Sequence, residues 1–233
     1  MTQKTGYYKP ETLRKFRQAL DEAKQAVKAG TETRVRISHD NSKMGPVASV
    51  STLPFLTCPE FCGETCGPKC YAAKLANLRP AVLRSYAINT ALAIYDPVSY
   101  WRQVSAAAAA VQYFRFHVSG DIMGKAYFHH MIDTARETPK TRFLCFTKQF
   151  DTVNAWISEN GDLPGNLQIL FSGWTNLQPD NPHGLPETNV IPKNAEDLPD
   201  GWKMCGGNCF ECACRGVGCW QAQSGDVIAF RMH

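Results

Sequence analysis

The pattern of apolar and polar positions near the N-terminus predicts one helix followed by two short strands. Residues 10–29 carry apolar side chains near helical spacing, begin at Pro10 and stop at Gly30, so we expect an amphipathic helix. Residues 34–39 alternate apolar with polar side chains, which is typical of a half-buried strand. Residues 46–53 indicate a second strand, and the first of two cysteine-rich segments follows it directly.

Helical spacing returns after that segment. Residues 71–93 have the periodicity of a helix, but Pro80 interrupts it because proline lacks the backbone N–H that a helix interior needs. Residues 97–111, which include a run of alanines, predict a further helix. No apolar run approaches the about 18 residues that a membrane-spanning helix needs, so we expect no membrane partner.

From residue 113 onward, apolar strands alternate regularly with helices. The expected strands cover residues 113–118, 142–147 and 167–172, and the expected helices cover residues 125–137 and 150–159. Apolar strands that alternate with helices are typical of parallel βαβ units whose strands are covered by helices. The sequence therefore predicts an α/β fold.

The C-terminal part of the chain adds weaker strand signals. Residues 188–191 and 227–231 predict two more strands, the last of which would close the sheet, and residues 192–208 predict a loop. Five or six parallel strands form either an open sheet or an incomplete (β/α) barrel, and in both architectures ligands bind at the C-terminal ends of the strands. With 233 residues, 44% of them hydrophobic, the chain fits a single domain over residues 1–233.

The first cysteine-rich segment, CPEFCGETCGPKCY, spans residues 58–71. Its glycine and proline residues oppose a regular helix and favour a loop that winds around a central object. Three residues separate each of its cysteines from the next, and they are Cys58, Cys62, Cys66 and Cys70. Thiolates suit iron–sulfur clusters and zinc, and the lack of a C-x2-C pair favours an iron–sulfur cluster. The alternative is four reduced thiols packed as small apolar side chains.

The second cysteine-rich segment, CGGNCFECACRGVGCW, spans residues 205–220 and fits either metal, since the C-x2-C pair suits zinc as well as an iron–sulfur cluster. Four thiols complete one site, and we leave out Cys214. The expected ligands are then Cys205, Cys209, Cys212 and Cys219. Because each segment holds at least four thiols, we expect two separate metal sites. The second site has either a structural role, pinning the C-terminal segment to the domain, or a redox role.

Composition indicates a reducing compartment. The first ten residues lack the apolar core of a signal peptide, so we expect a cytoplasmic protein whose ten cysteines are metal ligands or reactive thiols rather than disulfides. Cys145 lies inside an apolar strand and is expected to fill the core. A formal net charge of +4 permits contact with nucleic acid but falls short of the basic footprint of a dedicated nucleic-acid-binding protein.

Several short motifs precede the final cysteine-rich segment. They are SVSTLP at residues 49–54, TCPEFC at 57–62, CYAAK at 70–74, RFHVSGDI at 115–122 and FTKQFD at 146–151. As a set that runs from Lys43 to Trp220, they resemble the gene product 88 domain family, which is found mainly in phages and prophages. The resemblance implies a phage protein, and the family brings little settled function with it.

The first cysteine loop and the strand that follows it also resemble the radical S-adenosylmethionine enzymes. In that family a three-cysteine loop follows the first strand of a partial (β/α) barrel, and a segment at the end of the second strand holds the methionine amine. Here Cys62, Cys66 and Cys70 follow a strand, although the family spacing is C-x3-C-x2-C and Cys58 adds a fourth thiol. The resemblance implies a partial parallel barrel, a 4Fe–4S cluster at the loop, a second cluster near the C-terminus, and S-adenosylmethionine as a ligand.

Residues at the expected strand ends are candidate ligand contacts. Parallel topology brings these ends to one edge of the sheet, where they would line one pocket. The set consists of Ser119, Gly120, Asp121, Lys148, Ser172 and Trp174. Asp121 contacts either a ligand amine or a metal-bound water, or it caps the following helix. His117 is expected to be a hydrogen-bonded sheet histidine.

Three functions fit these features. The first is a radical S-adenosylmethionine-like enzyme that acts on an unknown small-molecule or macromolecular substrate. The second is a non-enzymatic iron–sulfur protein, fully ligated by thiolates, which the extra Cys58 favours. The third is a zinc-stapled phage module that binds nucleic acid or takes over host functions. The motifs of dinucleotide-binding folds, P-loops and α/β-hydrolases do not occur in the sequence.

Overall fold

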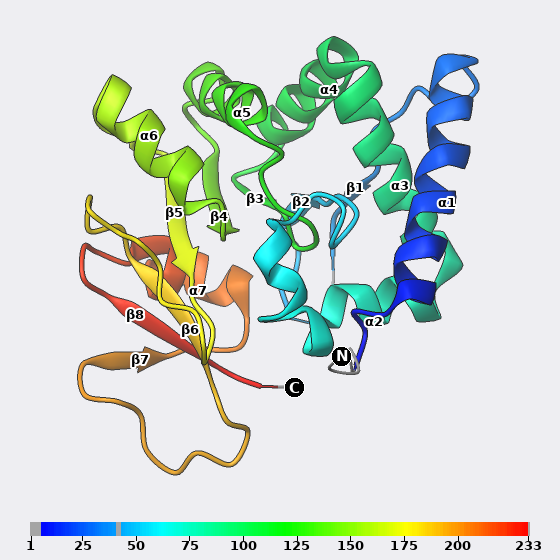
Figure 1. Cartoon of the computed structure of the whole chain (residues 1–233). Helices are drawn as coiled ribbons and strands as arrows, with labels where there is room; N and C mark the ends of the chain where they lie inside the picture. Colours follow the sequence, from blue (N-terminus) through cyan, green and yellow to red (C-terminus); the bar gives the residue numbers. More distant parts are fainter. Residues whose placement is uncertain (1–5, 41–42, 233) are drawn as a thin grey trace.

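The computed structural model describes residues 6–40 and 43–232, which contain an eight-stranded sheet (Figure 1). The strand order is β1-β2-β3-β4-β5-β6-β8-β7, and each neighbouring pair is parallel except the antiparallel pair β1–β2. The bounds are β1 Ile37–Ser38, β2 Ala48–Val50, β3 Tyr113–Phe116, β4 Arg142–Thr147, β5 Leu167–Ser172, β6 Glu187–Ile191, β7 Trp202–Met204 and β8 Val227–Arg231.

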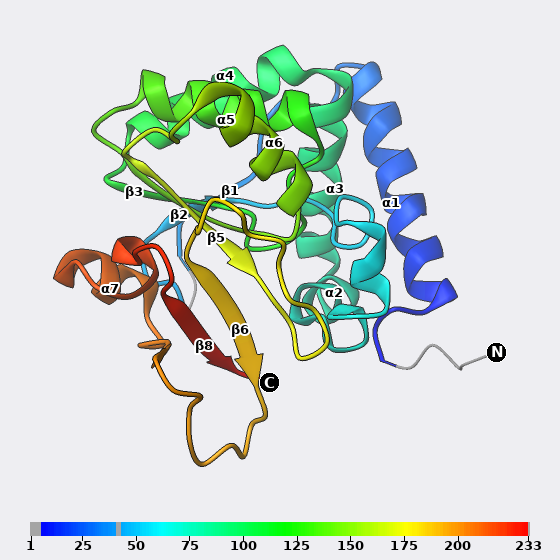
Figure 2. The same ribbon diagram turned by 60° about the vertical axis from the view of Figure 1, so that its left-hand side comes forward.

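Helices cover the two faces of this sheet unequally. Helices α3 to α6 lie along one face, α1 packs against α3 outside it, and α7 lies on the opposite face (Figures 1 and 2). The helix bounds are α1 Pro10–Lys28, α2 Tyr71–Leu78, α3 Pro80–Tyr95, α4 Pro97–Ala109, α5 Lys125–Glu137, α6 Phe150–Asn160 and α7 Cys209–Arg215, with short 3-10 helices η1 Glu60–Gly63, η2 Gly67–Lys69 and η3 Gly218–Gln221.

The central strand β4 shows why both faces are covered. Successive side chains of a strand point to opposite faces, so Phe143 and Cys145 join the core beneath α3 to α6, whereas Leu144 packs on the other face with Ala213 and Trp220. All of these side chains are buried. The second cysteine segment is therefore held in place as the apolar cover of a sheet face that the long helices leave open.

A predicted interruption of helical structure falls where proline requires it. Pro80 starts α3, and Arg79 before it has an extended backbone with φ −126° and ψ 96°, the conformation that a following proline favours. As a result, the predicted helix over residues 71–93 is divided into α2 and α3. The predicted helices over residues 125–137 and 150–159 are confirmed as α5 and α6.

The expectations that depended on the sheet as a whole were less accurate. The sheet is open, with β1 and β7 as its edges, so the predicted α/β fold is confirmed but the described strands do not close into a barrel. The described sheet has eight strands rather than the five or six parallel strands expected. The strand predicted over residues 34–39 forms only as the short β1, which is an antiparallel edge, and β7 forms inside the segment 192–208 that we expected to be a loop. The last strand, β8, lies between β6 and β7 instead of at the end of the sheet.

Two further expectations concern the N-terminal residues and the membrane. Residues 1–5, which contribute to the expectation that a signal peptide is lacking, lie outside the described residues. None of the helices in the described part of the chain has the length and apolar character needed to cross a bilayer.

Candidate functional site

A cavity of about 880 Å³ lies where the parallel strands end. Residues directly after β2, β3, β4 and β5 line it, as expected for ligand sites of parallel sheets. These lining residues include Ser51, Ser119, Gly120, Asp121, Lys148 and Gly173. The volume falls within the roughly 300–1,000 Å³ that is usual for small-molecule sites.

The first cysteine set, formed by Cys58, Cys62, Cys66 and Cys70, lines this cavity. The short helices η1 and η2 turn the chain between these cysteines, so the segment is irregular, as predicted. Gly67 is required because a Cβ there would lie 2.7 Å from the backbone oxygen of Cys62. Cys70 begins α2, and its sulfur accepts a hydrogen bond from the Ala73 amide at 3.4 Å.

The thiols of the first set influence one another. Hydrogen bonding with Cys58 and Cys66, followed by burial, raises the pKa of Cys62. The hydrogen bond with Cys62, assisted by the positive charge of Lys148, lowers the pKa of Cys66 to about 6 against the opposing effect of burial. Burial raises the pKa of Cys70 to about 12. The Cys66 thiol also donates to the backbone oxygen of Cys62 at 3.9 Å.

The second cysteine set lines the same cavity from the C-terminal segment, and it consists of Cys205, Cys209, Cys212 and Cys219. Helix α7 begins after Asn208, whose side-chain oxygen accepts a hydrogen bond from the Glu211 amide at 3.1 Å. The Trp220 indole donates to the backbone oxygen of Cys209 at 2.9 Å and fixes the segment against the sheet. Cys214 is exposed and does not belong to the cavity lining.

Asp121 connects the ends of β3 and β4. Its Oδ1 accepts hydrogen bonds from the Thr147 hydroxyl at 2.5 Å and the Ile122 amide at 2.8 Å, and its Oδ2 accepts from the Lys148 amide at 2.8 Å. Burial raises the pKa of Asp121, and these hydrogen bonds oppose the shift. The alternative in which Asp121 caps the next helix is wrong, because the N-cap of α5 is Gly124.

The other predicted strand-end residues gather on the same wall. The Lys148 ammonium donates to the Ser172 hydroxyl at 2.7 Å and lies 5.9 Å from the Trp174 ring centroid, and all three residues line the cavity. Ser119 donates its hydroxyl proton to the backbone oxygen of Thr52 at 2.9 Å. The structure thus brings the predicted contact residues to one place.

His117 lies just beyond β3, in a left-handed conformation with φ 57°. Its Nε2 is 3.0 Å from the Tyr127 hydroxyl and its Nδ1 is 3.7 Å from the Cys145 sulfur, so the prediction of a hydrogen-bonded histidine is confirmed. Burial, followed by the charge of Arg115, lowers the pKa of His117 to about 3. Cys145 is buried in the core, as predicted.

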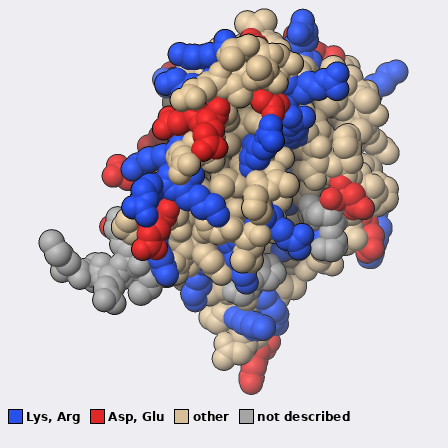
Figure 3. Space-filling view, turned by 90° about the vertical axis from the view of Figure 1, so that its right-hand side faces the viewer, with Lys and Arg blue, Asp and Glu red and all other residues tan. Residues whose placement is uncertain are grey.

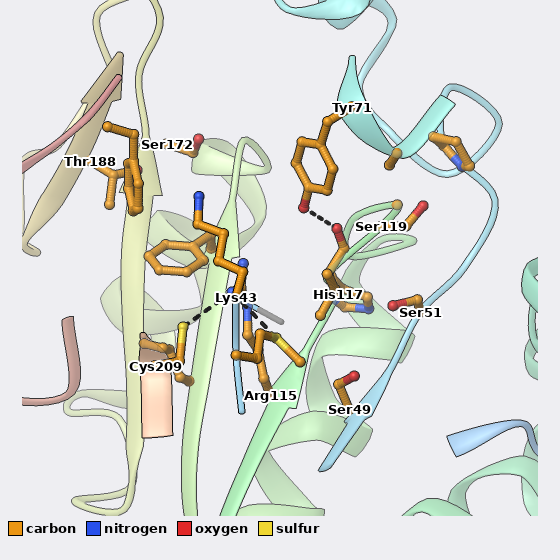
Figure 4. Close-up of a pocket in the computed structure, with 18 of the residues that line it drawn as sticks. Lys43, Ser49, Ser51, Tyr71, Arg115, His117, Ser119, Ser172, Thr188 and Cys209 are labelled. Carbon is orange, nitrogen blue, oxygen red and sulfur yellow. Dashed lines mark hydrogen bonds between the residues drawn. The ribbon is translucent and has the colours of Figure 1, made fainter. Parts of the chain in front are cut away.

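Arg115 is a cavity residue that sequence reasoning missed. Its guanidinium lies 4.5 Å from the Phe146 ring centroid, and its Nη1 donates to the sulfur atoms of Met44 at 3.6 Å and Cys209 at 3.8 Å. Figure 4 shows Arg115 between Cys209 and His117, with Tyr71 on the far wall, where its hydroxyl donates to the Val118 backbone oxygen. A lone charged residue in the apolar strand YFRF was the signal.

The two cysteine sets hold the metal ligands that the sequence predicts. Within residues 6–40 and 43–232, no group of three or more His, Cys, Asp or Glu side chains is placed so that it could hold a metal ion. The metal ligands named from the sequence therefore remain predictions. What the structure adds is that both sets line one cavity.

Comparison with known proteins identifies the family of this α/β protein with its two cysteine-rich segments. The family described as gene product 88 matches residues 13–227, so the chain belongs to the gene product 88 family, as the motifs predicted. No curated protein matches the chain, and no solved structure matches it.

Proposed function

We propose that this protein binds iron–sulfur clusters through its two cysteine sets and that a ligand occupies the cavity between them. The observation that carries the proposal is the convergence of eight cysteines from two distant segments on the lining of one cavity. Thiols that only filled a core would be expected among apolar side chains, as Cys145 is, rather than along a cavity wall.

The chemistry of the surrounding residues supports this choice. Thiolates are soft ligands that iron–sulfur clusters use, and a thiolate-ligated cluster carries negative charge. Arg115 donates a hydrogen bond to Cys209, and the positive charge of Lys148 helps to lower the pKa of Cys66, so a cation acts on each cysteine set. Burial raises the pKa of several of these thiols, so they are protonated at neutral pH and metal binding would have to displace their protons. Free cysteines in such number suit a reducing cytoplasm.

We further propose that the protein is a radical S-adenosylmethionine-like enzyme of unknown substrate. Cys62, Cys66 and Cys70 would hold a 4Fe–4S cluster, which supplies an electron to a bound ligand when one of its irons lacks a protein sulfur. Residues at the ends of the strands would contact S-adenosylmethionine, and they are Ser119, Gly120, Asp121, Lys148 and Ser172. In Asp121, Oδ2 accepts a single hydrogen bond from the protein and has capacity for another from an amine.

Metal and sulfide analysis of anaerobically purified protein tests this proposal. We expect absorption near about 400 nm and about eight irons with matching sulfide per chain, as two cubane clusters require. About four irons would mean a single cluster and would contradict the two-site prediction. Zinc without sulfide would refute the iron–sulfur proposal and would favour the zinc-stapled phage module instead.

A matched pair of variants makes the assignment residue-specific. Cys209→Ser removes a cavity-lining thiol of the second set, whereas Cys214→Ser removes an exposed thiol from the same short helix. We expect Cys209→Ser to lose about half of the iron and Cys214→Ser to retain all of it. Equal iron content in the two variants would contradict the ligand set.

Cys58, which lines the same cavity as Cys62, Cys66 and Cys70, favours a second candidate, a non-enzymatic protein whose clusters are fully ligated by thiolates. A fourth thiolate would occupy the iron that S-adenosylmethionine needs. Adding S-adenosylmethionine to the reduced protein separates the two functions. A changed cluster spectrum and cleavage of the nucleotide support the enzyme, and an unchanged spectrum supports a role in structure, electron transfer or sensing.

A further inference from the structure

The cavity has an excess of basic side chains. Two carboxylates line it, those of Asp40 and Asp121. Six basic residues line it, and they are Arg36, Lys43, Lys69, Arg115, Lys148 and Arg231. By contrast, basic and acidic side chains are interspersed over the molecular face that carries α1 (Figure 3). The cavity lining therefore carries more basic than acidic side chains.

Two of these cations, Arg115 in β3 and Lys148 directly after β4, come from neighbouring strands. Arg36 forms an ion pair with Glu32, and Arg231 donates to backbone oxygens. Arg115 and Lys148 form no salt bridge with any residue in the described part of the chain. A partly desolvated cation that forms no salt bridge costs free energy, and an anionic ligand would offset this cost.

Arg115 also has hydrogen-bonding capacity that the described residues leave unused. Its Nε is buried without a partner among them, and Nη1 has only two sulfur atoms, which are weak acceptors. The Phe146 ring lies 4.5 Å from the guanidinium carbon and positions the group. A planar guanidinium held in this way suits a carboxylate or a phosphate, to which it can donate two parallel hydrogen bonds.

Lys148 belongs to the same surface. It lies directly after β4, two positions beyond Phe146, and both residues line the cavity. The Arg115 guanidinium lies over the Phe146 ring and donates a hydrogen bond to Cys209 of the second cysteine set. The positive charge of Lys148 helps to lower the pKa of Cys66 in the first set. An anion bound by both cations would therefore lie between the two cysteine sets.

We infer that the cavity binds an organic anion whose carboxylate or phosphate group is held by Arg115 and Lys148 between the two cysteine sets. The remaining walls accommodate the rest of the molecule, since Tyr71, Phe146 and Trp174 add aromatic surface. The inference goes beyond the proposed metal binding and does not depend on it, because it rests on the two cations and the cavity.

Calorimetric titration of the anaerobically purified protein with inorganic phosphate and with succinate, at constant ionic strength, tests the inference. Three variants each remove one positive charge: Arg115→Gln, Lys148→Gln and the control Arg102→Gln, which alters an exposed residue of α4 outside the cavity. Iron and sulfide are measured on every sample, so a failure of metal binding is distinguished from a failure of anion binding.

At least one anion is expected to bind the wild type and Arg102→Gln equally, whereas Arg115→Gln weakens binding at least about tenfold. Arg115→Lys should recover only part of the affinity because it restores the charge without the planar fork. Preference between phosphate and succinate identifies the anionic group. If Arg115→Gln does not fold, the inference is tested by Lys148→Gln, which is also expected to lose anion binding.

Three outcomes would overturn the inference. One is that neither anion binds the wild type. Another is equal affinity for all three glutamine variants. The third is an Arg115→Gln protein that loses iron but keeps its anion affinity, which would mean that Arg115 serves only as the counter-charge of the second cysteine set.

Discussion

We predict that Gly120→Ala, in the segment after β3, strongly lowers the stability of the protein. Gly120 has φ +78°, and a Cβ at this position would lie 2.0 Å from the Thr52 hydroxyl oxygen and 2.5 Å from that of Thr57. Both threonines are buried, so neither hydroxyl can move into solvent. The substitution therefore combines an unfavourable backbone conformation with a steric clash at the floor of the cavity.

The magnitude follows from two contributions. An alanine in the left-handed region costs about 1–2 kcal/mol. Displacing the Thr57 hydroxyl disturbs its hydrogen bonds to the Leu53 backbone oxygen at 2.7 Å and from the Asp121 amide at 3.2 Å, each worth about 1 kcal/mol. The free energy of unfolding should therefore fall by about 3–4 kcal/mol.

Urea denaturation followed by circular dichroism measures this loss, and Gly30→Ala is the matched control. Gly30 has φ +71°, but a Cβ there would meet no atom within 4 Å, so its substitution isolates the backbone contribution of about 1–2 kcal/mol. If the two variants lose the same stability to within about 0.5 kcal/mol, the steric part of the reasoning is refuted.

Three more predictions follow from single residues. Cys66→Ala should lower the metal content of the purified protein, whereas Cys145→Ala should keep it and lose at most a few kcal/mol of stability, so equal metal content would contradict the ligand assignment. His117 has a pKa of about 3 in the folded protein and about 6.5 in the unfolded chain. Between these pH values the unfolded chain binds more protons, so the free energy of unfolding decreases as the pH is lowered. Between pH 6.5 and pH 5, His117→Gln should lose about 1.6 kcal/mol less than the wild type in urea titrations, and parallel losses would disprove the assignment. Thr147→Val removes a donor to the buried Asp121 carboxylate and should cost about 1.5–3 kcal/mol in the same assay, whereas a neutral result would mean that this hydrogen bond is not stabilising.

Local periodicity determined most of the individual elements. Strands β4 and β5 and helix α5 begin and end at the residues predicted from the sequence, because apolar spacing and flanking glycine or proline residues act over a few positions. The same local chemistry located the two cysteine segments outside the regular strands. The exposed position of Cys214 also agrees with leaving it out of the second set.

The order of the strands required the tertiary structure. β7 has three residues, too few to show a period, and the strand predicted over residues 34–39 forms only as the two-residue β1. Each pairs with one neighbouring strand that supplies its hydrogen-bonding partners. Whether the sheet closes also depends on pairing between strands far apart in the sequence. The sequence alone therefore left the open sheet and the partial barrel as alternatives.

For the candidate site, too, the sequence determined some features and the tertiary structure determined others. The sequence by itself determined which residue types were available for metal and ligand chemistry, since the cysteine spacings and the polar strand ends are local features. The tertiary structure decided that both cysteine sets line one cavity and that Arg115 lies between Cys209 and His117. These placements arise from packing the C-terminal segment onto a sheet face that includes Tyr113 and Leu144, more than 50 residues earlier in the chain, a contact that no local pattern encodes.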